Sequence, residues 1–185
     1  MSNRNLFAEL NSALREAKDH SDVSLTMPLQ AQQLNNASEL HYLRMIEPLR
    51  AIHKKYRLQE GDVSSHTKSA LRITLEWQQA VCKGLVKSEV KVSPENNERI
   101  DVVDSETNTA YELKVSGKNT HHEFYKDLVK VLTYNEYQEA QNKIKKLIFI
   151  SELSGISLLK ARLDSKFIQM LLGNHRLSIE LISLE

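Results

Sequence analysis

Two short runs of alternating apolar residues, joined by a polar turn, constrain the fold of this chain more than any other feature. The runs lie at 99–104 ("RIDVVD") and 109–116 ("TAYELKVS"), and the turn between them reads "SETN". Each run has the two-residue alternation of a β-strand, and the turn is short enough to join an antiparallel hairpin. If Asp104 faces Thr109 across this turn, counting back along both strands places Val102 opposite Tyr111.

The second strand of this hairpin has two chemically different faces. Side chains alternate along a strand, so Tyr111, Leu113 and Val115 share one face, which we expect to be core. Glu112 and Lys114 share the other face and place a carboxylate beside an ammonium group. The function of the chain therefore depends on whether this second face is merely solvated or forms a site.

The same count places Asp101 directly opposite Glu112, with Cβ atoms roughly 5 Å apart. Two carboxylates so placed repel each other unless a positive group lies between them. A divalent cation fits this position, and oxygen ligands suit Mg²⁺ or Mn²⁺. Lys114 on the same face could orient a water molecule or stabilise negative charge on a phosphate. The alternative is a solvated strand face on which Lys114 bridges the two carboxylates.

The rest of the chain is predicted to alternate helices and strands. Helical periodicity precedes the hairpin at 4–19, 29–58 and 66–84, followed by a strand pattern at 85–92. After the hairpin, the patterns predict a helix at 120–141, a buried strand at 145–151, a helix at 157–172 and a last strand at 177–184. The order α-β-β-β-α-β-α-β from residue 66 predicts an α/β fold with a mixed sheet covered by helices.

Composition excludes several classes of protein. The 185 residues carry a net charge of +1, which neither announces nor excludes a nucleic-acid partner. The single cysteine, Cys82, excludes an internal disulfide and a cysteine zinc cluster. No apolar run is long enough to cross a membrane, and no signal peptide is recognisable. We therefore expect a cytoplasmic protein without a membrane partner.

The hairpin sequence "RIDVVDSETNTAYELKVS" resembles the PD-(D/E)XK nuclease superfamily, which has the restriction-endonuclease-like fold. The family pattern is an Asp at the end of one strand, followed by Glu-x-Lys on the next, and here corresponds to Asp101, Glu112 and Lys114. The family core runs α-β-β-β-α-β, and residues 66–151 show the same predicted order. The resemblance leaves the first 60 residues unmatched, and Ile100 stands where the family has a nominal Pro.

This resemblance implies a Mg²⁺-dependent (or Mn²⁺-dependent) endonuclease that hydrolyses phosphodiester bonds in DNA, of the restriction or another defence type. Asp101, Glu112 and the backbone carbonyl of Leu113 would hold the metal, and Lys114 would orient the attacking water. Family members often carry a further Glu on the helix before the first strand, and Glu76 is the candidate here. The alternative for Glu76 is an ordinary surface glutamate.

The helix at 120–141 resembles the family's phosphate-contacting face. Lys126, Lys130 and Tyr134 recur on it at helical spacing, and Lys118 and Asn119 lie in the loop beside the predicted site. These five residues are therefore candidates for nucleic-acid contacts. The alternative is a solvated basic stripe.

Two parts are predicted along the chain. Residues 1–60 would form a helical N-terminal extension that dimerises or contacts DNA, and 61–185 would form the nuclease-like core. The apolar stripes of the extension need burial, against a second copy or against the core, and the nuclease resemblance implies a homodimer. Two other functions stay open: an RNase or repair nuclease of the same fold, and a non-catalytic module that retains the fold to bind nucleic acid or protein. The target sequence and the cleavage pattern do not follow from the residues.

Overall fold

The computed structural model describes residues 29–60 and 67–185, and the helix predicted at 4–19 lies outside these ranges. Two compact units make up the chain, residues 1–40 and 41–185, and helix α2 (Leu29–Glu60) runs through the boundary. The fold described below is that of the second unit. Its further elements are α3 (Thr67–Val81), β1 (Val86–Lys91), β2 (Arg99–Asp104), β3 (Thr109–Lys114), α4 (Thr120–Glu136), the 3₁₀ turn η1 (Ala140–Asn142), β4 (Lys146–Ser151), α5 (Leu153–Arg162), α6 (Ser165–His175) and β5 (Ser178–Ser183).

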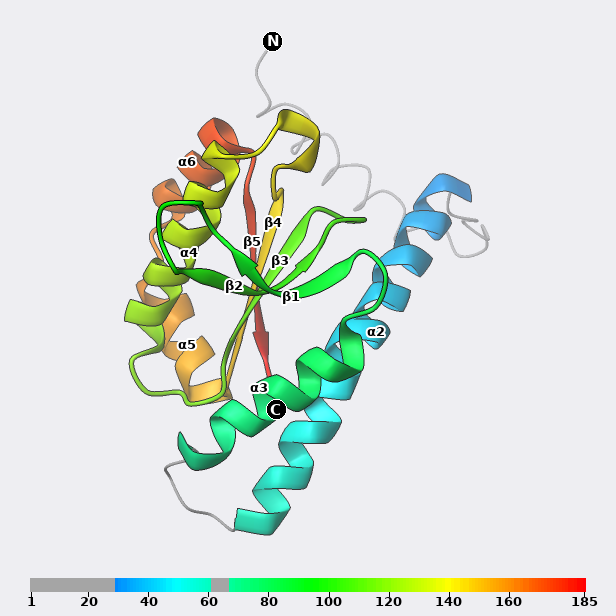
Figure 1. Cartoon of the computed structure of the whole chain (residues 1–185), viewed down its shortest axis with the longest axis vertical. Helices are drawn as coiled ribbons and strands as arrows, with labels where there is room; N and C mark the ends of the chain where they lie inside the picture. The colour runs from blue at the N-terminus through cyan, green and yellow to red at the C-terminus, as the bar shows by residue number, and fades with distance from the viewer. Residues whose placement is uncertain (1–28, 61–66) are drawn as a thin grey trace, which may run out of the picture. The chain divides into compact units, whose positions relative to one another are not determined.

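The five strands form one mixed sheet in the order β1-β2-β3-β4-β5 (Figure 1). β1, β2 and β3 are antiparallel neighbours, whereas β4 and β5 run parallel to β3. Asp104 pairs with Thr109 and Val102 with Tyr111, as the four-residue turn predicts. The predicted α/β class with a mixed sheet is therefore confirmed, and so is the register of the hairpin from Asp104 and Thr109 to Val102 and Tyr111, whereas the predicted pair of Asp101 and Glu112 is not among the paired residues.

The sheet is buried on both faces, because separate helices cover each of them. α2 and α3 lie over one face, and α4, α5 and α6 lie over the other (Figure 1). Tyr111 and Val115 belong to the core under α2 and α3, together with Trp77. Ala110 belongs to the core under α4, together with Phe124 and Phe149. The face that carries Glu112 is thus a second core and not a solvated surface.

Trp77 connects α3 to both α2 and the sheet. Its indole Nε1 donates a hydrogen bond to the carbonyl oxygen of Met45 at 2.9 Å, so the buried ring leaves no polar atom unpaired. The ring also meets Tyr111 edge to face, with centroids 6.4 Å apart. α2 contains Pro48 but continues through it as one helix. None of the helices within 29–60 and 67–185 is both long and apolar enough to cross a membrane.

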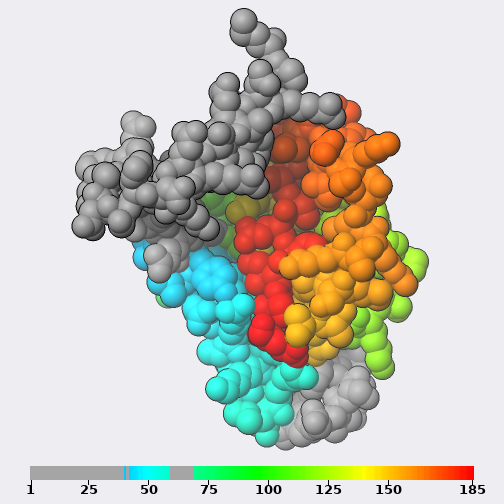
Figure 2. Space-filling view, turned by 180° about the vertical axis from the view of Figure 1, so that it is seen from behind, coloured from blue at the N-terminus to red at the C-terminus, as the bar shows by residue number. Residues whose placement is uncertain are grey.

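β5 forms one edge of the sheet and reaches the surface between α2 and the pair α5 and α6 (Figure 2). Charged side chains lie along this edge. Lys146 pairs with Glu180 at 2.6 Å, and Arg50 of α2 donates to the carbonyl oxygen of Ser183 at 3.1 Å. Charges and side-chain hydrogen bonds on an edge strand oppose edge-to-edge association.

The single helix predicted at 157–172 is wrong, because two helices occupy this stretch. α5 ends at Arg162, and Leu163 and Asp164 both have extended backbone conformations. The Asp164 carboxylate accepts a hydrogen bond from the backbone N–H of Phe167 at 2.9 Å and so caps the start of α6. Gly173 lies inside α6, and the C-cap is Arg176 in the left-handed region.

We expect Asp164→Ala to lower the free energy of unfolding by roughly 1 kcal/mol, because the first turn of α6 loses its side-chain acceptor. Chemical denaturation of both proteins measures this loss. Asp164→Asn keeps an acceptor oxygen and serves as the matched control. Equal losses in the two variants would show that the cap contributes nothing.

Candidate functional site

Three carboxylates and one ammonium group meet between the sheet and α4, and we call Asp101, Glu112, Asp127 and Lys130 the carboxylate cluster. Asp101 comes from β2, Glu112 from β3, and Asp127 and Lys130 from successive turns of α4. Lys130 Nζ lies 2.8 Å from Glu112 Oε1 and 2.7 Å from Asp127 Oδ1. It also donates to the carbonyl oxygen of Arg99 at 2.9 Å, so α4 is tied to both β2 and β3.

Burial dominates the electrostatics of the cluster. Glu112 is only 2% exposed, and its pKa is raised well above the usual range by loss of solvent and by the charges of Asp101 and Asp127. The pKa of Asp127 is also raised, chiefly by burial. Burial alone would lower the pKa of Lys130, but Glu112 and Asp127 outweigh it, and the net shift is upward. Lys130 therefore stays charged and acts as the counter-ion of two carboxylates.

The side chain of Asp101 accepts a hydrogen bond from the backbone of the neighbouring strand β3. Its Oδ2 accepts from the N–H of Leu113 at 2.8 Å, beyond the last backbone pair of β2 and β3, which is Val102 and Tyr111. Burial raises the pKa of Asp101 to about 6, against the lowering effects of the Leu113 hydrogen bond and of Lys130. A proton can therefore bind to this carboxyl group near neutral pH.

Gln78 of α3 supports Asp101 from the other side. Its Nε2 donates to the carbonyl oxygen of Asp101 at 3.0 Å and to Glu89 Oε1 at 2.9 Å. Glu89 has φ 51°, a left-handed conformation that side chains other than glycine rarely adopt within a strand. Gln78 was not predicted from the sequence, in which its position one residue after Trp77 is the one available signal.

Lys114 shares a face of β3 with Glu112, as predicted, but pairs elsewhere. Its ammonium nitrogen lies 3.8 Å from Glu123 Oε1 of α4, and both side chains are about one-third exposed. The ammonium group beside Glu112 is that of Lys130, which comes from the helix and not from the Glu-x-Lys motif. Asp127 was also missed, although its spacing of three residues from Lys130 is the signal of a helical ion pair.

Glu76, the candidate fourth site residue, contacts α2. Its carboxylate accepts hydrogen bonds from Lys55 Nζ at 2.8 Å and from the Tyr56 hydroxyl at 3.0 Å. These hydrogen bonds, that from Lys55 first, lower the pKa of Glu76. The side chain that α3 directs to Asp101 is Gln78, two residues further on.

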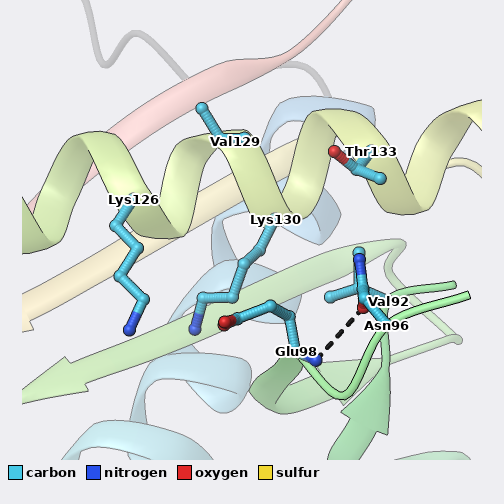
Figure 3. A pocket seen from close by; sticks show the side chains of 7 residues that line it. All are labelled: Val92, Asn96, Glu98, Lys126, Val129, Lys130 and Thr133. Carbon is cyan, nitrogen blue, oxygen red and sulfur yellow. Dashed lines mark hydrogen bonds between the residues drawn. The ribbon is translucent and has the colours of Figure 1, made fainter.

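The five candidates for nucleic-acid contacts differ in exposure. Lys118 and Asn119, just before α4, and Lys126, in its second turn, are exposed. Tyr134 is half-buried against the core, and the side chain of Lys130 is only 11% exposed within the carboxylate cluster. Figure 3 shows Lys126 and Lys130 extending from the same side of α4, with the Glu98 side chain directed toward Lys130. The ammonium group of Lys130 is thus used inside the protein.

The cluster as arranged is a poor fit for a divalent cation. Lys130 Nζ occupies the space against Glu112 and Asp127 in which an ion would have to bind. Within the part of the chain that the structure describes, no three His, Cys, Asp or Glu side chains are placed to hold one metal ion. Binding of Mg²⁺ or Mn²⁺ stays a prediction.

Comparison with known proteins decides the family. No family model matches the chain, and no solved structure matches it. Antitoxin HigA-2 from Vibrio cholerae serotype O1 (strain ATCC 39315 / El Tor Inaba N16961) is 37% identical over 81 residues, which are 43% of this chain and 72% of the relative. The chain belongs to the family of Antitoxin HigA-2. More than half of this HigA-2-family chain lies outside the matched stretch.

Membership of the HigA-2 antitoxin family overturns the predicted DNA endonuclease. The relative is an antitoxin and not a nuclease. The physical reason for the error lies in the motif, because Asp101, Glu112 and Lys114 match the nuclease pattern in sequence while the buried charges are balanced by Lys130. Three residue types at the right spacing did not establish the chemistry.

Proposed function

We propose that this chain is an antitoxin-type binding module, which forms a complex with a toxic protein and suppresses its action. The observation that carries this proposal is the 37% identity to Antitoxin HigA-2 over 72% of that relative. Of the functions that the sequence left open, the non-catalytic module agrees with this relative.

The contacts of the carboxylate cluster support a structural and not a catalytic role for Asp101 and Glu112. Lys130 is held by Glu112, Asp127 and the carbonyl oxygen of Arg99, and thereby joins α4 to the middle of the sheet. A buried ion network of this kind fixes how a helix lies on a sheet, even where it adds little net stability. A binding module needs such a fixed surface, because preorganised surfaces lose less conformational entropy on association.

We also propose that the chain has the restriction-endonuclease-like fold. The element order from α3 to β4 is α-β-β-β-α-β, which is the order that the resemblance to the restriction-endonuclease-like fold implies. We propose that the chain uses a scaffold of this kind for binding. The homodimer predicted for it stays a prediction.

A growth selection tests the proposed function. Genomic fragments from the organism that encodes the chain are cloned in a bacterial host that expresses the chain and in one that does not. We expect at least one fragment that blocks growth only in the second host, and its protein product should copurify with the chain in a stoichiometric complex. Recovery of the same fragments from both hosts would sink the proposal.

A nucleic-acid partner is a second candidate, favoured by the exposed Lys118 and Asn119 just before α4 and the exposed Lys126 in its second turn. If these residues contact phosphates, log Kd for duplex DNA rises with log salt concentration, and each lost contact lowers the slope. We expect Lys118→Gln to reduce the slope by about 1. Fluorescence anisotropy at four salt concentrations measures it. Lys160→Gln, an exposed lysine on α5, is the control, and an equal slope in both variants would exclude Lys118 as a contact.

A further inference from the structure

A hollow of about 320 Å³ lies beside the carboxylate cluster, between α4 and the turn that joins β1 to β2. α4 contributes Lys126, Val129, Lys130 and Thr133, which follow the i, i+3, i+4, i+7 pattern of one helix face. The turn contributes Val92, Asn96 and Glu98 (Figure 3). The volume is at the lower end of the roughly 300–1,000 Å³ of protein ligand sites and has room for one large side chain.

Hydrogen bonds hold the turn side of the hollow in place. The N–H of Val92 donates to the carbonyl oxygen of Glu98 at 3.0 Å, and the N–H of Glu98 donates to Asn96 Oδ1 at 3.1 Å. Lys91 Nζ donates to the carbonyl oxygen of Pro94 at 3.3 Å. The bond from Lys130 to the carbonyl oxygen of Arg99 then fixes the distance between this turn and α4. The hollow is therefore formed before any ligand binds.

Apolar and charged groups are separated within the hollow. Val129 on α4 is 60% exposed, so it presents an apolar surface to solvent. Val92 on the opposite side of the hollow is buried. Lys126 and Glu98, which are both exposed, line the hollow with opposite charges. Among the described residues, no carboxylate lies within 4 Å of the Lys126 ammonium group and no cation within 4 Å of the Glu98 carboxylate. Both charges are available to a partner.

We propose that this hollow is a docking site for a partner protein, which inserts an apolar side chain between an acidic and a basic residue. The apolar side chain would pack on Val129, the acidic residue would face Lys126, and the basic residue would face Glu98. A buried apolar anchor surrounded by a polar rim is the usual form of an energetically dominant contact. A phosphate backbone fits worse, because the hollow is largely apolar and Glu98 repels phosphate. The inference rests on the proposed function, since it assigns a surface to the protein partner.

A designed peptide tests the site without knowledge of the natural partner. The full ¹⁵N-labelled chain is titrated with N-acetyl-Glu-Leu-Lys-amide and followed by two-dimensional NMR. We expect chemical-shift changes confined to residues 92–98 and 126–133. N-acetyl-Glu-Ser-Lys-amide, which lacks the anchor, should bind about tenfold more weakly or not at all. Absence of shifts in these two segments at the highest peptide concentration would overturn the proposal.

A charge exchange tests the orientation. Lys126→Glu should weaken binding of N-acetyl-Glu-Leu-Lys-amide about tenfold and should restore it for N-acetyl-Lys-Leu-Lys-amide. Lys160→Glu on α5 is the matched control and should change neither titration. Equal binding of the first peptide to the parent and to Lys126→Glu contradicts the site. These outcomes are separate from the growth selection, so a failed docking site and a failed antitoxin function can be told apart.

Discussion

Replacement of Lys130 by methionine is expected to lower the free energy of unfolding by about 3–5 kcal/mol, the largest effect of any single change to the carboxylate cluster. Methionine preserves most of the packed length of the side chain but removes the ammonium group. Glu112 and Asp127 then lose the counter-ion that lies 2.8 Å and 2.7 Å from them. The α4 contact to the carbonyl oxygen of Arg99 is lost as well. Urea denaturation at pH 7 measures the change as a lower midpoint at an unchanged slope.

Two further variants identify the cause of this loss. Lys126→Met removes an exposed ammonium group one turn earlier on α4 and should change stability by less than about 0.5 kcal/mol. Adding Glu112→Gln to Lys130→Met removes one of the stranded carboxylates and should restore part of the loss. If Lys130→Met is as stable as Lys126→Met, the cluster does not hold α4 on the sheet.

The hairpin was predictable because its constraints are local. The two-residue alternation and the four-residue turn fix which residues pair, and the observed pairs of Asp104 with Thr109 and of Val102 with Tyr111 follow from counting alone. Trp77 and Ile73 likewise fall on one helical stripe, and both are buried. Local periodicity is enough to predict which residues are buried when a helix or strand has a single apolar face.

The character of the Glu112 face was not predictable from the same pattern. Alternation shows that Glu112 and Tyr111 point to opposite sides, but not that α4 covers the side of Glu112. The counter-ion comes from Lys130, which is 18 positions further along the chain, and only the crossover through α4 brings it to β3. Lys114 is much nearer in sequence and was therefore assigned the role, although its ammonium group lies beside Glu123.

The break between α5 and α6 was missed for a related reason. Apolar residues continue at helical spacing through 157–172, and this spacing hides a change of axis. The signal lay in Asp164, an N-cap residue type that is followed by a run of good helix formers. The apolar spacing of 157–172 predicted one helix, whereas Asp164 caps a second helix that begins at Ser165.

Asp101→Asn is expected to stabilise the protein relative to the parent by an amount that grows with pH. The pKa of Asp101 is about 6 in the folded protein, against 3.8 without perturbation. Between these two values the folded chain binds more protons at this site than the unfolded chain, so ionisation lowers the stability of the parent as pH rises. A shift of this size corresponds to roughly 3 kcal/mol once both states are ionised. Asparagine carries no charge, and its amide oxygen can still accept from the N–H of Leu113, so the variant escapes this cost.

The measurement is the difference in unfolding free energy between Asp101→Asn and the parent, from urea denaturation at pH 4, 5, 6 and 7.5. The difference should change by roughly 2 kcal/mol in favour of the variant across this range, because part of the effect is already present at pH 4, and most of the change should be complete near pH 6. Glu136→Gln, at an exposed position at the end of α4, controls for general charge effects and should give a nearly constant difference. A constant difference for Asp101→Asn would mean that the carboxyl group of Asp101 ionises as it does in the unfolded chain. The burial that raises the pKa of Asp101 would then be fully offset by the hydrogen bond from Leu113 and the charge of Lys130, which lower that pKa.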